Sequence, residues 1–175
     1  MTQEEVRGMI EATDSPRNKA LLACLYLLGP RITEALTLKK ADIRIDEDGV
    51  TFKIRPLKRR DKHSPLLFRH SITIPLGAPF MNFFTSWAGG IAKDEDYLFP
   101  GYGPHLSRSQ AWRIVHRLNP KTFPHFFRHT RLSWVADASG GDAFAVRDWA
   151  GRKTIPVEYV GRRQGKLARL ARKIA

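Results

Sequence analysis

The chain has 175 residues, and its 30 lysines and arginines against 17 aspartates and glutamates leave a formal net charge of +13. That length suits a single domain with an ordinary hydrophobic core. Such a charge attracts polyanions, most often nucleic acid, although a ribosomal or simply basic protein would carry it too. The basic residues are spread along the chain instead of lining one amphipathic helix, which disfavours a membrane-surface role.

The only cysteine, Cys24, lies in an apolar run over 19–28 that is too short to cross a bilayer. One cysteine excludes a disulfide framework and a cysteine-based zinc site, so a buried thiol in a reducing compartment is predicted. The N-terminus is polar and acidic and shows no secretory signal. We therefore expect a cytoplasmic, DNA-associated protein.

Three helices are predicted in the first part of the chain. The first begins near Thr2, which carboxylates follow in the first turn. The second covers 17–28, is almost wholly apolar and should be buried, and it ends at Gly29 and the proline after it. A third, short helix runs through Leu36, with Thr33 as its expected cap.

After Asp42 the apolar residues follow a period of two. They alternate with polar residues in 43–45 and 50–54 around a turn at 46–49, which is typical of a β-hairpin. A third strand is predicted at 71–75, and the loop before it is rich in lysine and arginine.

Helical patterns then return for the rest of the chain. They are predicted at 79–87, 107–118, 126–138, 142–150 and, with an apolar row on one face, 165–175. Helices, a small antiparallel sheet and more helices indicate an α+β fold that is mainly α.

Two arginines are candidates for binding a phosphate. Arg31 directly follows the apolar helix, although a surface ion pair with Glu34 explains it equally well. Arg128 lies three residues after His125 and would share its helix face, although an ordinary surface arginine fits here too. Together, two guanidiniums can each donate paired hydrogen bonds to the non-bridging oxygens of a phosphate, which lysine cannot do.

A tyrosine is the candidate nucleophile. Tyr159 is followed by a group of basic residues that favour a nearby phosphate, and Tyr102, between two glycines, is the second choice. Tyr26 and Tyr97 lie in apolar surroundings that indicate packing. Because a free tyrosine has a pKa of about 10, the nucleophile needs a base or cationic neighbours.

His125 is the candidate base, since an unperturbed histidine has a pKa of about 6.5 and accepts protons at neutral pH. Protonation of a leaving 5′ oxygen suits a lysine near the cationic loop, and we prefer Lys58 to Lys53 and Lys62. Arginines, a histidine and a tyrosine suffice to cut a phosphodiester, so neither a metal nor a cofactor is expected.

These residues together resemble the catalytic domain of tyrosine recombinases, the phage integrase family, over nearly the whole chain. The run from Arg31 to Glu34 resembles the first box of the family. Lys58 falls on its hairpin lysine, and the segment from His125 to Arg128 resembles its His-x-x-Arg box, which is the most specific part.

Tyr159 falls on the nucleophile of the family, and two departures precede it. The glycine before the nucleophile helix is usually followed by histidine or tryptophan, and here Arg152 follows it. We therefore expect Arg152 to contact the phosphate. Tyr159 lies seven residues later (159 − 152), about two fewer than in the family pattern.

The resemblance implies a tyrosine recombinase catalytic domain over 1–175, with a helical core and a small three-stranded antiparallel sheet. As a further departure from the family, we expect the N-terminal core-binding domain to be absent. We expect the chain to be either a catalytic fragment of a longer recombinase or a minimal integrase of archaeal or viral type. The implied activity is site-specific recombination or integration of double-stranded DNA through a 3′-phosphotyrosyl intermediate, by a homo-oligomer, expected to be a tetramer. A catalytically silent DNA-binding remnant and a type IB topoisomerase-like activity are the alternatives.

Overall fold

The computed structural model describes residues 1–54, 70–152, 154 and 157–160. Lys58 and the predicted helix at 165–175 lie outside these residues. The chain forms two compact units, Met1–Arg131 and Leu132–Ala175, which we describe one at a time.

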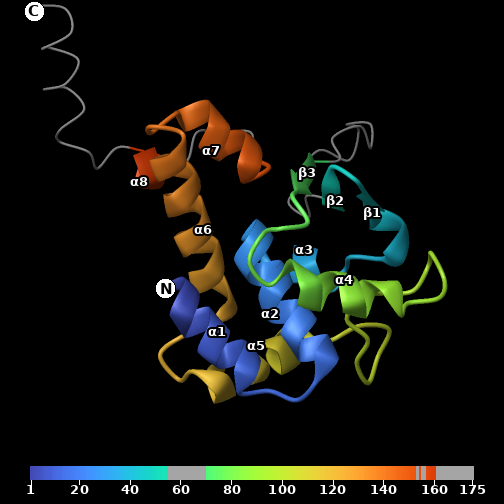
Figure 1. Cartoon of the computed structure of the whole chain (residues 1–175). Helices are drawn as coiled ribbons and strands as arrows, with labels where there is room; N and C mark the ends of the chain where they lie inside the picture. The colour runs from blue at the N-terminus through green and yellow to red at the C-terminus, as the bar shows by residue number, and fades with distance from the viewer. Residues whose placement is uncertain (55–69, 153, 155–156, 161–175) are drawn as a thin grey trace, which may run out of the picture. The chain divides into compact units, whose positions relative to one another are not determined.

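The first unit begins with helices, followed by a small sheet and then by further helices (Figure 1). The helices before the sheet are α1 (Gln3–Glu11), α2 (Pro16–Leu28), α3 (Ile32–Leu36) and the 3₁₀ turn η1 (Lys40–Asp42). The sheet contains β1 (Ile43–Asp46), β2 (Gly49–Ile54) and β3 (His70–Ile74). Then come α4 (Met81–Gly89), α5 (Arg108–Leu118) and α6 (Pro124–Ala138), which continues into the second unit.

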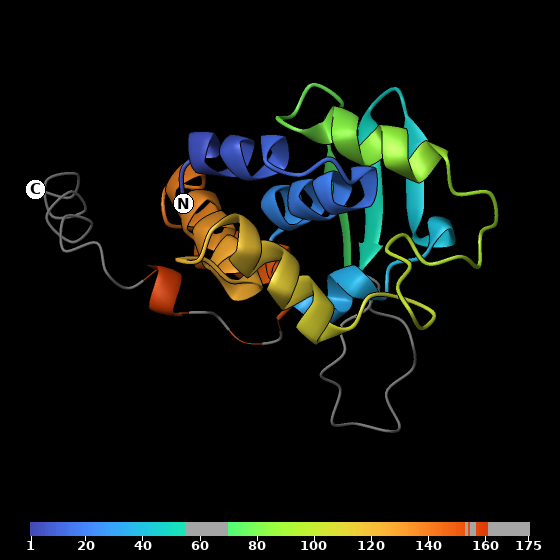
Figure 2. The same cartoon turned by 90° about the horizontal axis from the view of Figure 1, so that it is seen from below.

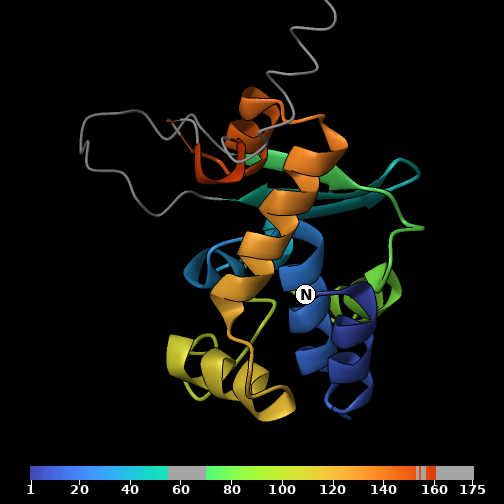
Figure 3. The ribbon, with the colours of Figure 1, turned by 90° about the vertical axis from the view of Figure 1, so that its left-hand side faces the viewer.

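Helix α2 is the centre of the first unit, as its apolar sequence predicts. Every residue from Ala20 to Leu28 is buried. Ser15 caps its first turn, and Gly29 ends it in the left-handed region at φ 60°. Helices α1, α3 and α4 all contact α2, and Figure 3 shows α1 beside it. This single buried helix therefore supplies a large part of the core.

Helix α3 begins differently from the prediction. Its N-cap is Arg31 and Thr33 lies inside the helix, so the prediction of Thr33 as the cap is wrong. The carboxylate of Glu34, at the third helical position, accepts the backbone N–H of Arg31 at 2.8 Å. Because Arg31 is already extended and Glu34 satisfies its donor, the helix starts two residues earlier than expected.

The three strands form an antiparallel sheet in the order β1-β2-β3, which confirms the predicted hairpin and third strand. The inward-facing residues of β2 and β3 are apolar and buried, and Phe52 pairs with Ile72 across the sheet. The ring of Phe52 also contacts Phe84 of α4, with 4.9 Å between ring centroids. Helix α4 thus covers the inner face of the sheet (Figure 2).

The second unit contains the end of α6, α7 (Ala143–Trp149) and α8 (Val157–Val160). Its buried cluster comprises Leu132, Ala136, Val146 and Ala150. Asp142 caps α7 by accepting the N–H of Phe144. None of the helices among the described residues has the length and apolar character needed to span a membrane.

Candidate functional site

The side chain of Arg31 is held by a buried carboxylate. Its Nη1 donates to Oε1 of Glu34 at 2.6 Å, while the other oxygen of Glu34 accepts the backbone N–H of Arg31. The Glu34 side chain is only 4% exposed, whereas that of Arg31 is 28% exposed. The ion pair with Glu34 is therefore present, but its carboxylate is buried instead of lying at the surface. The carboxylate both starts α3 and orients the guanidinium.

Arg128 is buried, with 3% of its surface exposed, so the alternative of an ordinary surface arginine is also wrong. Its Nη1 donates to the backbone carbonyl of Gly29 at 2.9 Å. That carbonyl lies two residues before Arg31. A hydrogen bond between segments 99 residues apart therefore ties the two candidate arginines to one turn of backbone.

A third arginine, which the sequence reasoning missed, reinforces this junction. The Nε of Arg131 donates to the carbonyl of Leu27 at 2.6 Å, and its guanidinium lies 5.6 Å from the ring centre of Tyr26. The last carbonyls of a helix have no partner within the helix and carry a partial negative charge. Arg128 and Arg131 of α6 thus satisfy the C-terminal end of α2 with two cations.

Burial changes the ionisation of the groups at this junction. It lowers the pKa of Arg131 and raises the pKa of Tyr26. The positive charge of Arg131 acts in the opposite direction on Tyr26. Tyr26 thus stays a neutral packing residue, as predicted.

Gly29 makes this close approach of α6 to α2 sterically feasible. A Cβ at this position would lie 2.7 Å from Cβ of Arg131 and 3.3 Å from Cα of Arg128. The backbone is also left-handed here, which side chains disfavour. The sequence predicted Gly29 only as a helix terminator. The role of Arg131 beside Arg128 did have a signal in the sequence, because the two arginines are three residues apart and share one helix face.

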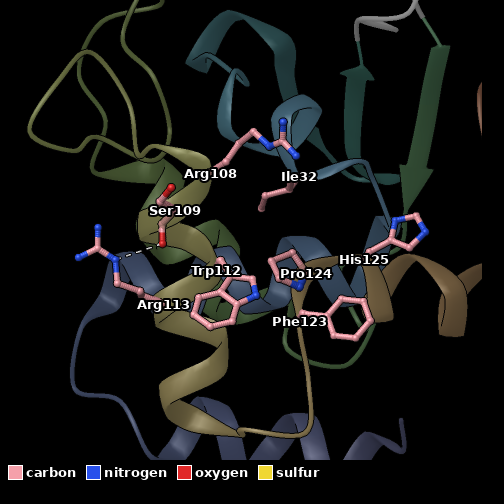
Figure 4. Close-up of a pocket in the computed structure, with 8 residues that line it drawn as sticks. All are labelled: Ile32, Arg108, Ser109, Trp112, Arg113, Phe123, Pro124 and His125. Carbon is pink, nitrogen blue, oxygen red and sulfur yellow. Dashed lines mark hydrogen bonds between the residues drawn. The ribbon is translucent and has the colours of Figure 1, made fainter.

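His125 is exposed and lines a pocket of about 680 Å³ in the first unit. Figure 4 shows the side chains around it, which come from α3, α5 and the start of α6. They are Ile32, Arg108, Ser109, Trp112, Arg113, Phe123, Pro124 and His125. Because Ile32 directly follows Arg31, the pocket adjoins the segment that carries the first candidate arginine.

Tyr159 and Arg152 belong to the second unit. Tyr159, on α8, is partly buried and packs against the cluster formed by α6 and α7. Nη1 of Arg152 donates to Oε1 of Glu158 at 2.7 Å, which links it to the residue before Tyr159. Tyr102, the second choice for the nucleophile, is fully exposed in the first unit. Within the described part of the chain, no three His, Cys, Asp or Glu side chains form a group that could hold a metal.

Residues 1–155 match the sequence model of the phage integrase family. The chain belongs to this family. Tyrosine recombinase XerD of Halalkalibacterium halodurans is 26% identical over 179 residues, which cover 91% of this chain and 55% of that protein. Tyrosine recombinase XerA of Pyrococcus furiosus is 25% identical over 171 residues, with the same two coverages. The chain thus spans about half the length of these members of the family.

Solved structures in the family share the fold. The XerH site-specific recombinase, in a pre-cleavage complex with its difH substrate, superposes with a TM-score of 0.76 at 17% identity. The match covers 100% of this chain and 53% of that one. The XerA recombinase gives a TM-score of 0.70 at 20% identity, and the match covers 99% of this chain and 64% of that one. The predicted tyrosine recombinase catalytic fold is confirmed.

Proposed function

We propose that this chain is the catalytic part of a site-specific DNA recombinase that cleaves and rejoins DNA through a 3′-phosphotyrosyl intermediate. The observation that carries the proposal is the hydrogen bond from Arg128 to the carbonyl of Gly29, two residues before Arg31. It brings a second guanidinium to the turn that carries the first, in a chain of the phage integrase family. Membership of the tyrosine recombinases supports the recombination itself.

The two arginines would bind the non-bridging oxygens of the scissile phosphate. Arg31 is oriented by Glu34, and Arg128 by the carbonyl of Gly29. Guanidiniums fixed in advance stabilise developing charge without reorganising during the reaction, which is a large term in phosphoryl transfer. Both cations have buried partners, which supports a role that requires precise orientation.

In the proposed step, the hydroxyl oxygen of Tyr159 forms a bond to phosphorus and gives its proton to a base, for which His125 is our candidate. The bond between phosphorus and the 5′ oxygen breaks, and that oxygen takes a proton, for which Lys58 is our candidate. Arg152 would contact the phosphate. One phosphodiester replaces another, so rejoining needs only a 5′ hydroxyl to attack the phosphotyrosine.

The test uses a pool of nicked DNA duplexes with randomised sequence around the nick, labelled at the 5′ end of the strand to be cleaved. The short fragment released by cleavage diffuses away and traps the covalent complex. We expect a labelled adduct that survives denaturing electrophoresis with the unmodified chain and is lost in Tyr159→Phe. The matched control, Tyr102→Phe, should retain it.

An adduct that persists in Tyr159→Phe and disappears in Tyr102→Phe would identify Tyr102 as the nucleophile. A chain that binds duplex DNA but forms no adduct with any member of the pool would instead be a silent DNA-binding remnant. Relaxation of a supercoiled plasmid without exchange between two DNA molecules would indicate the topoisomerase-like activity.

A further inference from the structure

The pocket in the first unit combines aromatic surface with positive charge. Trp112 is 46% exposed and Phe123 is 45% exposed, although large aromatic side chains are usually buried. Both line the pocket, beside Arg108. None of the described residues that line it is acidic. Its volume of about 680 Å³ lies within the range of small-ligand sites, about 300–1,000 Å³.

Trp112 is held as a platform. Its ring stacks on His116, one helical turn further along α5, with 4.4 Å between centroids and 19° between planes. This contact restrains the indole while almost half of the side chain stays accessible. Because the indole is already restrained, little side-chain entropy is lost when another flat ring stacks on it.

The side chains of Arg108 and Arg113, the two arginines of α5 that line the pocket, point in different directions. Figure 4 shows the guanidinium of Arg108 extending over Ile32, on the side of the pocket that adjoins α3. Arg113 extends away to the outer side, and its Nε donates to the carbonyl of Ser109 at 3.4 Å. Arg108 is therefore the cation that an anion entering the pocket would meet.

We propose that this pocket binds an unpaired nucleotide of the DNA, with its base against Trp112 and its backbone phosphate on Arg108. Bases within a duplex stack on their neighbours on both sides, so only a base that has left the stack can offer a face to an aromatic ring. The proposal rests on the proposed function, in which Arg31 binds the cleaved phosphate. Ile32, the next residue, lines the pocket. The occupant would then be a nucleotide near the cleaved phosphate.

The test separates base stacking from charge. The binding of a short labelled oligothymidylate is compared with that of an abasic chain of the same length and charge, by fluorescence anisotropy. The unmodified chain should prefer the oligothymidylate by about tenfold, which is the order of the gain from stacking one base on an aromatic ring. Trp112→Ala should abolish this preference, and Trp112→Phe should restore part of it.

Arg108→Ala should weaken both ligands by a similar factor and reduce the salt dependence of binding by about one phosphate contact. Two controls match these variants. Arg117→Ala removes an exposed cation of α5 that does not line the pocket, and Tyr102→Ala removes an exposed aromatic ring elsewhere. Both should keep the tenfold preference, and Trp112→Ala should leave the affinity for blunt duplex DNA unchanged.

The proposal is overturned if Trp112→Ala keeps the preference for bases, or if Tyr102→Ala removes it equally. An equal loss of affinity for blunt duplex would also overturn it, because the ring would then contact paired DNA. The assay involves no cleavage. If the chain shows the base preference but forms no covalent adduct, the pocket proposal stands and the proposed cleavage reaction is contradicted.

Discussion

Gly29 has a backbone φ of 60°, and its carbonyl accepts the hydrogen bond from Arg128. The absence of a side chain lets Cβ of Arg131 approach it closely. At the scale of single residues, the placement of Arg128 against the turn before Arg31 thus depends on a residue that has no side chain. A change here should act on stability and on the site together.

Gly29→Ala should lower the free energy of unfolding by about 1–3 kcal/mol, since alanine is strained at positive φ and its Cβ would collide with Arg131. Urea denaturation measures this change. Gly8→Ala is the matched control: Gly8 lies inside α1 with open space around it. That variant should gain about 0.5–1 kcal/mol. Equal effects of the two variants would contradict the role assigned to Gly29.

At the scale of elements, α2 illustrates how an apolar sequence controls ionisation. Its thiol, Cys24, is fully buried, and burial raises the pKa of Cys24 from 9.0 to about 12. A buried neutral thiol is inert, because the thiolate is the reactive form. The cysteine of this helix therefore reports on the integrity of the core.

Cys24 should not react with a thiol reagent at pH 8 until the protein unfolds. Above about pH 9 the unfolded chain releases the thiol proton and the folded chain retains it, so stability should fall as pH rises from 9.0 towards 12. The slope due to one proton is at most about 1.4 kcal/mol per pH unit. Urea denaturation at several pH values measures it.

Cys24→Ala provides the comparison for this slope. Tyr26, whose pKa is also raised, remains in both proteins, so the difference between their slopes isolates the thiol. We expect a shallower decline in the variant, whatever its absolute stability. Identical slopes, or rapid reaction of the native thiol, would show that α2 opens to solvent.

At the scale of the whole molecule, the net charge of +13 is a direct physical argument for polyanion binding. Each phosphate that a cation neutralises releases counterions, so the logarithm of the affinity for duplex DNA falls linearly with the logarithm of salt concentration. With roughly five or more contacts, the slope should be about −4 or steeper.

Fluorescence anisotropy of a labelled duplex, titrated at increasing concentrations of potassium chloride, measures this slope. Sucrose at matched osmolality is the control, and it should leave the affinity almost unchanged because it carries no charge. A slope near zero would mean that the positive charge does not contact the DNA backbone.

Much of the fold was predictable because the signals are local. The buried run of α2, the alternation in β1 and β2, and the apolar periodicity of α5 and α7 each appear in consecutive residues. The cap of α3 was mispredicted because the N-cap is an arginine, whereas Ser, Thr, Asp and Asn are the preferred caps, and the contact that marks the start is made by Glu34.

The sequence by itself determined the helical and strand order, the basic charge and the resemblance to tyrosine recombinases, because residue type and spacing carry those properties. Whether Arg31 and Arg128 were surface residues stayed open, because each fits an exposed helix when taken alone. Only the tertiary structure decided it: Arg128 is buried against a carbonyl 99 residues away, and Glu34 is buried beside Arg31. Burial and long-range hydrogen bonds depend on which segments meet, and no local pattern specifies that.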